Sequence, residues 1–177
     1  MARRKATGNR EDPQEQNERQ FFDLLGRGSQ ALQRGQIGTA VELLEHAWQF
    51  DQEHPDLTLN LAGAYILSKK FRQAVDLLEP LSEREPHNPM VWTNLGAAYL
   101  GNPVLAEDED QQRAIAAFKK ALEINPVTPN VAYNIGLIYV DRRENEKALL
   151  WFRRAVQANP NDRDARNYIK KLAEEDS

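Results

Sequence analysis

The sequence of 177 residues contains no cysteine, and this absence excludes disulfide bridges, thiolate metal sites and thiol nucleophiles. It also has no unbroken apolar run of the roughly 18 residues that a transmembrane helix needs, so we expect no membrane insertion. No apolar stretch follows the basic residues at the N-terminus, which argues against a secretory signal peptide. Together these absences predict a soluble, cytoplasmic protein.

Residues that favour strands are also scarce. Valine, isoleucine and threonine together number 20, whereas leucine and alanine, which favour helices, number 41. Apolar residues do not alternate with polar ones over long stretches. They recur instead at spacings of three and four, as in Trp92, Leu95, Gly96 and Tyr99. The composition and the spacing predict an all-α protein.

The chain contains internal repeats. Two segments share a pattern of small, leucine and aromatic residues: the first has Trp92, Leu95, Gly96, Tyr99, Ala114, Phe118, Ala121 and Pro126, and the second has Ile135, Gly136, Tyr139, Ala148, Phe152, Ala155 and Pro160. Weaker copies upstream have Leu61, Ala62, Tyr65, Ala74, Leu78 and Pro86, and Leu24, Gly28, Ala31, Ala40, Leu44 and Ala47. This pattern resembles the tetratricopeptide repeat (TPR) family, whose repeat is about 34 residues long.

The resemblance implies a right-handed helical solenoid of four helix-turn-helix repeats, each with two antiparallel helices, A and B. The repeats are expected at 21–54, 55–88, 89–128 and 129–162, the third with a six-residue insertion. Residues 1–20 are expected to form a polar tail leading into the first helix, and residues 163–177 a capping helix and tail. A solenoid needs such a cap because its last repeat otherwise exposes an apolar face.

Prolines mark several expected helix starts. Asn88-Pro89 and Thr128-Pro129 each place a capping side chain before a first-turn proline. Asp12-Pro13 carries the same signal, so the first helix is expected to begin near Pro13. Pro80 falls inside a predicted helix B, where a kink is expected because proline lacks an N–H and crowds the preceding turn.

The insertion spans 101–112, between helices A and B of the third repeat. It contains four carboxylates, on Glu107, Asp108, Glu109 and Asp110, and no Lys or Arg. Removing it from the totals of 27 acidic and 23 basic residues leaves 23 of each, so the net charge of −4 equals the charge of this segment. We expect an acidic surface loop, with a contact to a cation or a basic partner as the alternative.

Helix geometry separates two stripes on each helix A, because each residue turns the helix by about 100°. Positions 4, 7, 8 and 11 of the repeat form the packing stripe, and positions 2, 6, 9 and 13 lie almost opposite. The TPR resemblance implies that the second stripe and its border line a concave peptide-binding groove. The candidate groove residues are Leu59, Asn60, Gly63, Leu67, Met90, Thr93, Asn94, Ala97, Asn130, Tyr133, Asn134 and Leu137.

An asparagine ladder at position 6, formed by Asn60, Asn94 and Asn134, is the feature best suited to a peptide backbone, because a carboxamide both donates and accepts hydrogen bonds. The same side chains could instead bond across helices within the scaffold. A neutral, partly apolar groove also suits an amphipathic helix, and the N-terminal segment or a second protomer could occupy it.

No Lys or Arg lies on the groove stripe. The acidic tails of heat-shock chaperones, which TPR co-chaperones hold with a cationic clamp, are therefore disfavoured as partners, as is nucleic acid.

The pattern favours a non-catalytic adaptor that binds a peptide or protein segment in this groove. The alternative is a self-assembling structural subunit of a larger complex. Trp151, near the outer face of its helix B, is expected to be half-buried, with a contact on the convex face as the alternative. His46, His54 and His87 share no metal-ligand spacing, and no phosphate-binding loop or carboxylate pair in a cleft is evident. We therefore expect no catalytic residue, metal or cofactor.

Overall fold

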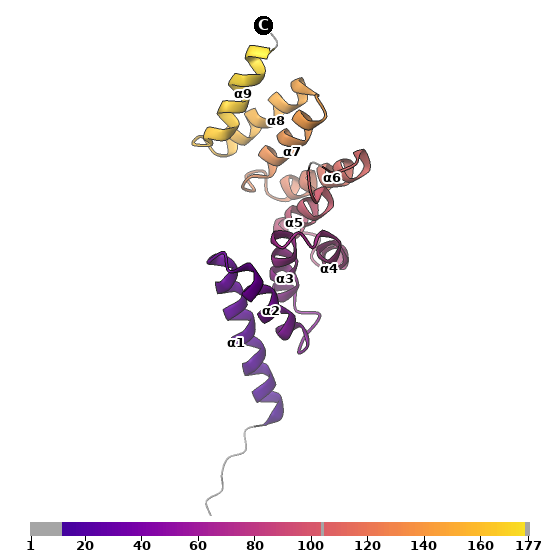
Figure 1. Ribbon diagram of the computed structural model, residues 1–177, viewed down its shortest axis with the longest axis vertical. Helices are drawn as coiled ribbons and strands as arrows, with labels where there is room; N and C mark the ends of the chain where they lie inside the picture. The colour runs from indigo at the N-terminus through magenta and orange to yellow at the C-terminus, as the bar shows by residue number, and fades with distance from the viewer. Residues whose placement is uncertain (1–11, 104, 176–177) are drawn as a thin grey trace, which may run out of the picture.

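The computed structural model describes residues 12–103 and 105–175, and this part of the chain is helical without strands. The helices are α1 (Pro13–Gln33), α2 (Ile37–Trp48), α3 (Pro55–Leu67), α4 (Phe71–Arg84), α5 (Pro89–Leu100), α6 (Asp108–Ile124), α7 (Val131–Asp141), α8 (Asn145–Ala158) and α9 (Arg163–Glu175). They stack in chain order along the long axis, with α1 and α9 at opposite ends (Figure 1). The predicted solenoid of four helix pairs and a cap is confirmed.

Two of the predicted helix starts are confirmed by their caps. The Asp12 carboxylate accepts a hydrogen bond of 3.0 Å from the backbone N–H of Gln14, so α1 begins at Pro13. Residues 13–20 therefore belong to a helix and not to a tail. Asn88 accepts from the N–H of Met90 at 3.0 Å in the same way at the start of α5. Residues 1–11 of the predicted tail lie outside the described residues.

The predicted start of α7 at Pro129 is wrong. The Thr128 hydroxyl donates to the backbone oxygen of Asn125 at 2.7 Å and is therefore turned away from the helix it was expected to cap. Asn130 then adopts a left-handed conformation, with φ of 63°, and α7 begins at Val131, two residues after the predicted start. Asparagine tolerates this conformation better than most residues.

In the third and fourth repeats, a glycine of helix A makes room for an aromatic ring from helix B. A Cβ atom on Gly96 would lie 2.6 Å from the Phe118 ring, and one on Gly136 would lie 2.7 Å from the Phe152 ring. Phe118 and Phe152 are both fully buried. The glycines of the repeat pattern therefore let the two helices of a pair approach closely.

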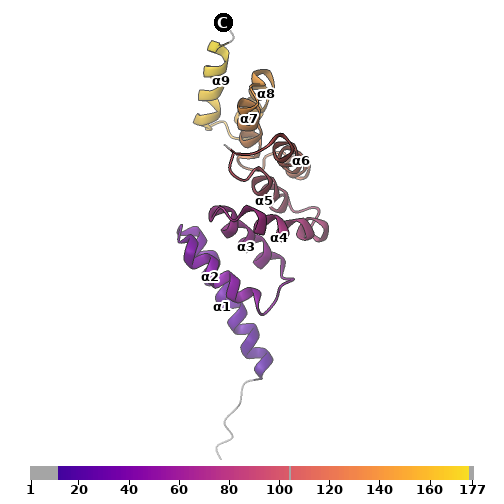
Figure 2. The same cartoon turned by 45° about the vertical axis from the view of Figure 1, so that its right-hand side comes forward.

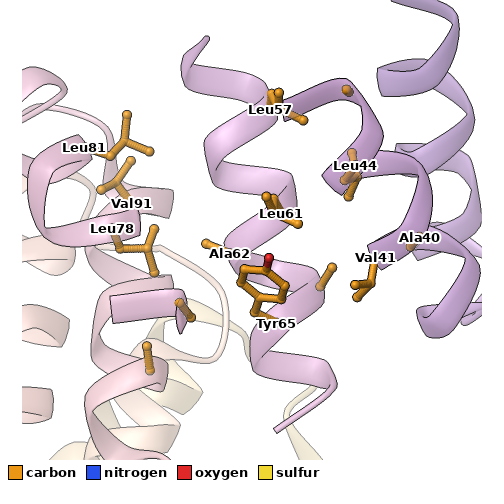
Figure 3. Close-up of a cluster of buried hydrophobic side chains, with 14 of the residues drawn as sticks. Ala40, Val41, Leu44, Leu57, Leu61, Ala62, Tyr65, Leu78, Leu81 and Val91 are labelled. Atoms are coloured by element: carbon orange, nitrogen blue, oxygen red, sulfur yellow. The ribbon is translucent and has the colours of Figure 1, made fainter. Parts of the chain in front are cut away.

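The buried residues form two clusters, one centred on α1 to α5 and the other on α6 to α9. In the first cluster, Leu57 and Leu61 of α3 lie between Leu44 of α2 and Leu78 of α4 (Figure 3). Trp151 belongs to the second cluster and is 9% exposed, so the expectation of a half-buried indole on the outer face is wrong. The Arg154 guanidinium covers it, 5.1 Å from the ring centroid.

The cap α9 is held by aromatic stacking. The Tyr168 ring lies 4.7 Å from the Phe152 ring, with 11° between their planes, and meets the Tyr133 ring edge-on at 6.1 Å. Ala165 and Leu172 are buried on the same helix. The predicted capping role of this segment follows from these contacts. No helix in the described part of the chain is long and apolar enough to span a bilayer.

The insertion in the third repeat is divided between a longer turn and a longer helix. Helix α5 ends at Leu100 and α6 begins at Asp108, and α6 has 17 residues whereas α4 has 14. Glu107 is the N-cap residue of α6, and Asp108, Glu109 and Asp110 form its first turn. The prediction of an acidic loop is therefore wrong for this part. Carboxylates there stabilise the helix because they face the positive end of its dipole.

A tyrosine, a glutamate and a cation join the first and second repeats. The Tyr65 hydroxyl donates to the Glu45 carboxylate at 2.9 Å, and the Lys70 ammonium lies 3.8 Å from the same carboxylate and 5.2 Å from the Tyr65 ring centroid. A cluster of the same three kinds of residue joins the second and third repeats. Tyr99 donates to Glu79 at 2.8 Å, and the Arg113 guanidinium pairs with Glu79 at 2.8 Å while covering the Tyr99 ring.

The first of these clusters predicts a loss of stability at high pH. Burial, and then the hydrogen bond and charge of Glu45, raise the pKa of Tyr65 to about 12. Because the pKa is higher in the folded than in the unfolded state, this stabilisation is complete below about pH 10 and is lost as the pH rises toward 12. Between about pH 9 and about pH 11 the free energy of unfolding should fall by about 1 kcal/mol more in the native chain than in Tyr65→Phe. Urea unfolding at both pH values measures this difference. An equal fall in the free energy of unfolding in the native chain and in Tyr65→Phe would contradict the prediction.

Candidate functional site

The candidate groove lies on the exposed side of α3, α5 and α7, which follow one another along the stack (Figures 1 and 2). Leu67 and Met90 are the most exposed of its apolar residues, at 60% and 48%. The other predicted groove residues of α3 and α5 are partly buried, namely Leu59, Asn60, Gly63, Thr93, Asn94 and Ala97. The structure thus places the predicted stripe of α3 and α5 at the surface, where a ligand can reach it.

The three asparagines of the ladder differ in their surroundings. The Asn60 amide donates to the Ser29 hydroxyl at 3.0 Å, and that hydroxyl donates to the backbone oxygen of Leu25 at 2.8 Å. Asn94 lies beside Gly63, 3.8 Å from the place of a Cβ atom there. Within 12–103 and 105–175, no side-chain hydrogen bond is formed by Asn94 or Asn134. The Asn60 amide therefore forms a hydrogen bond between α3 and α1, whereas the Asn94 and Asn134 amides remain available to bind a ligand.

Tyr133 and Asn130 do not face the same space as the rest of the predicted stripe. The Tyr133 ring lies 5.5 Å from the Phe152 ring, packed toward α8 and α9, and burial raises the pKa of its hydroxyl. Asn130 precedes α7. Both residues line a separate hollow of about 180 Å³ on the α8 side. Their predicted contact with a groove ligand is therefore not supported by their position.

An apolar pocket of about 480 Å³ lies between α5 and α7. It contains three predicted groove residues, Ala97, Asn134 and Leu137. Its other lining residues are Ile66, Phe71, Leu100, Gly101, Pro103, Gln111, Phe118, Ile138, Val140, Asp141 and Tyr168. The lining is mainly aliphatic and aromatic with a few polar groups, which is the composition of a ligand-binding site.

The pocket lies between two helices, α5 and α7, that have few contacts with one another. The first and third helices, and the third and fifth, contact one another directly, whereas α5 and α7 scarcely touch. Gly101 ends α5 with φ of 57°, and the Phe71 ring lies 3.5 Å from where its Cβ would be. A residue with a side chain is strained at this φ, so glycine allows the turn to leave the helix without filling the pocket.

Polar groups fix one edge of the pocket. The Gln111 amide, which is buried, donates to the Asp141 carboxylate at 2.7 Å. Arg142 donates to the Asp108 carboxylate at 3.0 Å and to the side-chain amide oxygen (Oε1) of Gln111 at 3.3 Å. The first turn of α6 is thereby tied to the turn after α7. Asp108, predicted as a possible contact for a partner, forms this bond within the chain, and its side chain remains 81% exposed.

Sequence reasoning missed the pocket residues Ile66, Leu100 and Val140. All three follow the last residue of the packing stripe, at position 12 of their repeats, and are apolar. Their shared position in the repeat could have identified these residues from the sequence. No group of three or more His, Asp or Glu side chains within the described residues is arranged to hold a metal ion.

Family models for the tetratricopeptide repeat match residues 31–98 and 103–163. The chain belongs to the tetratricopeptide repeat family. A thermophilic TPR protein of Thermus thermophilus has a similar fold, with a TM-score of 0.74, 22% identity, and coverage of 86% of this chain and 80% of that chain. A mutant of MamA is 26% identical with a TM-score of 0.69, covering 90% of this chain and 89% of that one.

Among curated proteins, the TPR chain is similar to anaphase-promoting complex subunit 3 of Schizosaccharomyces pombe. The two are 31% identical over 55 residues, which are 31% of this chain and 8% of that protein. The TPR chain therefore spans a small part of that subunit's length. As in other TPR proteins, the fold is one for protein interaction or scaffolding.

Proposed function

We propose that this TPR protein is a non-catalytic adaptor that binds a peptide or protein segment in the concave groove along α3, α5 and α7. The observation that carries the proposal is the apolar pocket of about 480 Å³ between α5 and α7. An apolar side chain of a partner enters it, and the carboxamides of Asn94 and Asn134 bond the partner's backbone. A preformed stack spares the protein the cost of ordering itself, so only the partner must become ordered.

The groove also favours a protein over nucleic acid as its partner. Its charged groups at the stripe positions are Asp56 and Asp141, and it carries neither Lys nor Arg there. Phosphates need cations for binding, and the same argument disfavours the acidic tails of heat-shock chaperones.

The asparagine ladder provides one test. A peptide selected from a phage-displayed library against the intact chain serves as the probe. Loss of two hydrogen bonds in Asn94→Ala/Asn134→Ala should weaken its binding about tenfold, whereas Asn60→Ala alone should change it less than about twofold. Isothermal titration measures both, after circular dichroism shows equal helix content. Unchanged affinity in a variant that lacks all three asparagines would rule the ladder out.

A second candidate function is that of a self-assembling structural subunit, and the N-terminal end of the stack favours it. Phe22 and Phe50 are 52% and 39% exposed there, beside a hollow of about 500 Å³ that also borders His54. If this end joins protomers, light scattering should show a mass that rises with concentration, and Phe22→Ser/Phe50→Ser should restore the monomer. A constant monomer mass in the native chain would exclude this candidate.

A further inference from the structure

The clusters that join neighbouring repeats follow a fixed register, and the third junction departs from it. Glu45 and Glu79 each come directly after the residue of helix B that packs on helix A, Leu44 and Leu78. Each accepts a hydrogen bond from the tyrosine of the next repeat. The register predicts a carboxylate directly after Phe118 as well.

The residue after Phe118 is Lys119, so the third junction has a cation where the other two have the glutamate. Tyr139 occupies the place of Tyr65 and Tyr99, but its hydroxyl forms no hydrogen bond within the described residues. A hollow of about 280 Å³ lies at this point, bounded by α6, the end of α7 and the start of α8. It is on the side of the B helices and does not share a lining residue with the groove pocket.

The charges around this hollow favour an anion. Lys119, Arg142 and Lys147 line it together with one carboxylate, Glu144. The Lys147 ammonium lies 5.4 Å from the Tyr139 ring centroid, and Lys147 holds the repeat position of Arg113, which covers the Tyr99 ring at the second junction. Asp108 also pairs with Arg142, so three cations face two carboxylates, and a surplus of one positive charge lies beside an unused hydroxyl donor.

Glu144 does not replace the missing carboxylate. It accepts a hydrogen bond of 2.7 Å from Arg142 and another from Lys147, and these bonds hold the pKa of Glu144 below its ordinary value. No bond between Glu144 and either Tyr139 or Lys119 is found in the described part of the chain. Glu144 is therefore committed to its two cations, and Lys119 has no carboxylate partner there.

We propose that this hollow binds the carboxylate of a glutamate or aspartate side chain from a protein partner, in the place that Glu45 and Glu79 fill at the other junctions. The Tyr139 hydroxyl donates to the carboxylate, and Lys119 and Lys147 flank it, while Ile115 and Ala116 pack against the methylene groups of the side chain. The surface is distinct from the concave groove, and the proposal does not rest on the proposed function.

The test uses the full chain with ¹³C-labelled tyrosine rings, the Tyr139 signal being assigned from Tyr139→Phe. A blocked pentaglutamate peptide is the probe, and a blocked pentaglutamine peptide is its neutral control. Pentaglutamate should shift the Tyr139 signal in a saturable manner, and pentaglutamine should not. Lys119→Gln should weaken the binding about tenfold, because a charged hydrogen-bonding partner is lost.

Lys119→Glu restores the internal carboxylate and supplies a readout that does not depend on the probe. It should abolish pentaglutamate binding and shift the Tyr139 signal in the absence of any peptide, because the hydroxyl then donates within the chain, as Tyr99 donates to Glu79 at 2.8 Å at the second junction. Lys120→Glu is the matched control, since Lys120 lies on the same helix but pairs with Glu123 at 3.2 Å. It should leave the affinity within about twofold, because exposed charges away from the site are weakly coupled to it.

Three results would overturn the proposal. Pentaglutamate could leave the Tyr139 signal unchanged, or Lys120→Glu could weaken binding as much as Lys119→Glu, which would indicate general attraction between charges. Inorganic phosphate could shift the signal with the affinity of pentaglutamate, which would indicate an anion site without preference for a protein carboxylate. The groove experiments use another face and other variants, so their outcome is independent of this one.

Discussion

Replacing Phe152 with alanine is expected to lower the free energy of unfolding by about 4 kcal/mol. Phe152 is fully buried and contacts Gly136 of α7, Tyr133 of the same helix and Tyr168 of α9. Loss of the ring leaves a cavity where α7, α8 and α9 meet. Closing that cavity requires α7 and α9 to move, and their packing against α8 resists the movement.

The unfolding of this variant should also become less cooperative. Each repeat of a solenoid is stabilised by its neighbours, so damage near one end releases that end first. Urea unfolding followed by circular dichroism measures the free energy, and hydrogen exchange locates the released helices in α7 to α9. Leu150→Ala is the matched control, because Leu150 lies on the same helix but is 65% exposed. It should cost less than about 0.5 kcal/mol, and a similar loss in both variants would contradict the assigned core.

The sequence was sufficient to predict the fold because each repeat packs by the same local rule. Gly96 and Phe118, or Gly136 and Phe152, recur at positions that only close helix pairing explains. The helix starts at Asp12-Pro13 and Asn88-Pro89 were also predictable, because each capping side chain bonds a backbone N–H only two residues later. The start at Pro129 failed because Thr128 has a competing acceptor nearby, the backbone oxygen of Asn125.

The candidate site was predictable only in part. Stripe geometry identified Ala97, Asn134 and Leu137, since it needs no knowledge of neighbouring repeats. It could not reveal the space between α5 and α7, because that depends on how helices of different repeats pack. It also could not assign Tyr133, whose ring is drawn toward the aromatic residues of α8 and α9. Contacts between distant residues decide both features.

Replacing Ala97 with tryptophan should reduce the affinity for the peptide selected from the phage-displayed library by about a hundredfold. Ala97 lines the pocket between α5 and α7 from the middle of α5, and its side chain is partly exposed. An indole at this position occupies much of the pocket, so a partner loses the burial of one large apolar side chain, worth about 1.5–3 kcal/mol, and meets a steric clash in addition. Isothermal titration with the selected peptide measures the loss.

Gln73→Trp is the control for the added indole. Gln73 is exposed on α4, outside the groove, so the same side chain there should leave both affinity and stability nearly unchanged. Circular dichroism of Ala97→Trp should match the native chain, because the indole enters a preformed space. Equal affinities in Ala97→Trp and the native chain would show that the peptide does not use the pocket.

The binding face itself is tested most directly by mapping the selected peptide onto the chain with methyl-labelled leucine and isoleucine. Binding in the groove predicts that the largest chemical-shift changes fall on Ile66, Leu100, Leu137 and Ile138, which line the pocket between α5 and α7. Exposed Leu150 of α8 should not respond. Changes confined to Leu150, or to methyl groups at the N-terminal end of the stack, would contradict binding in the groove.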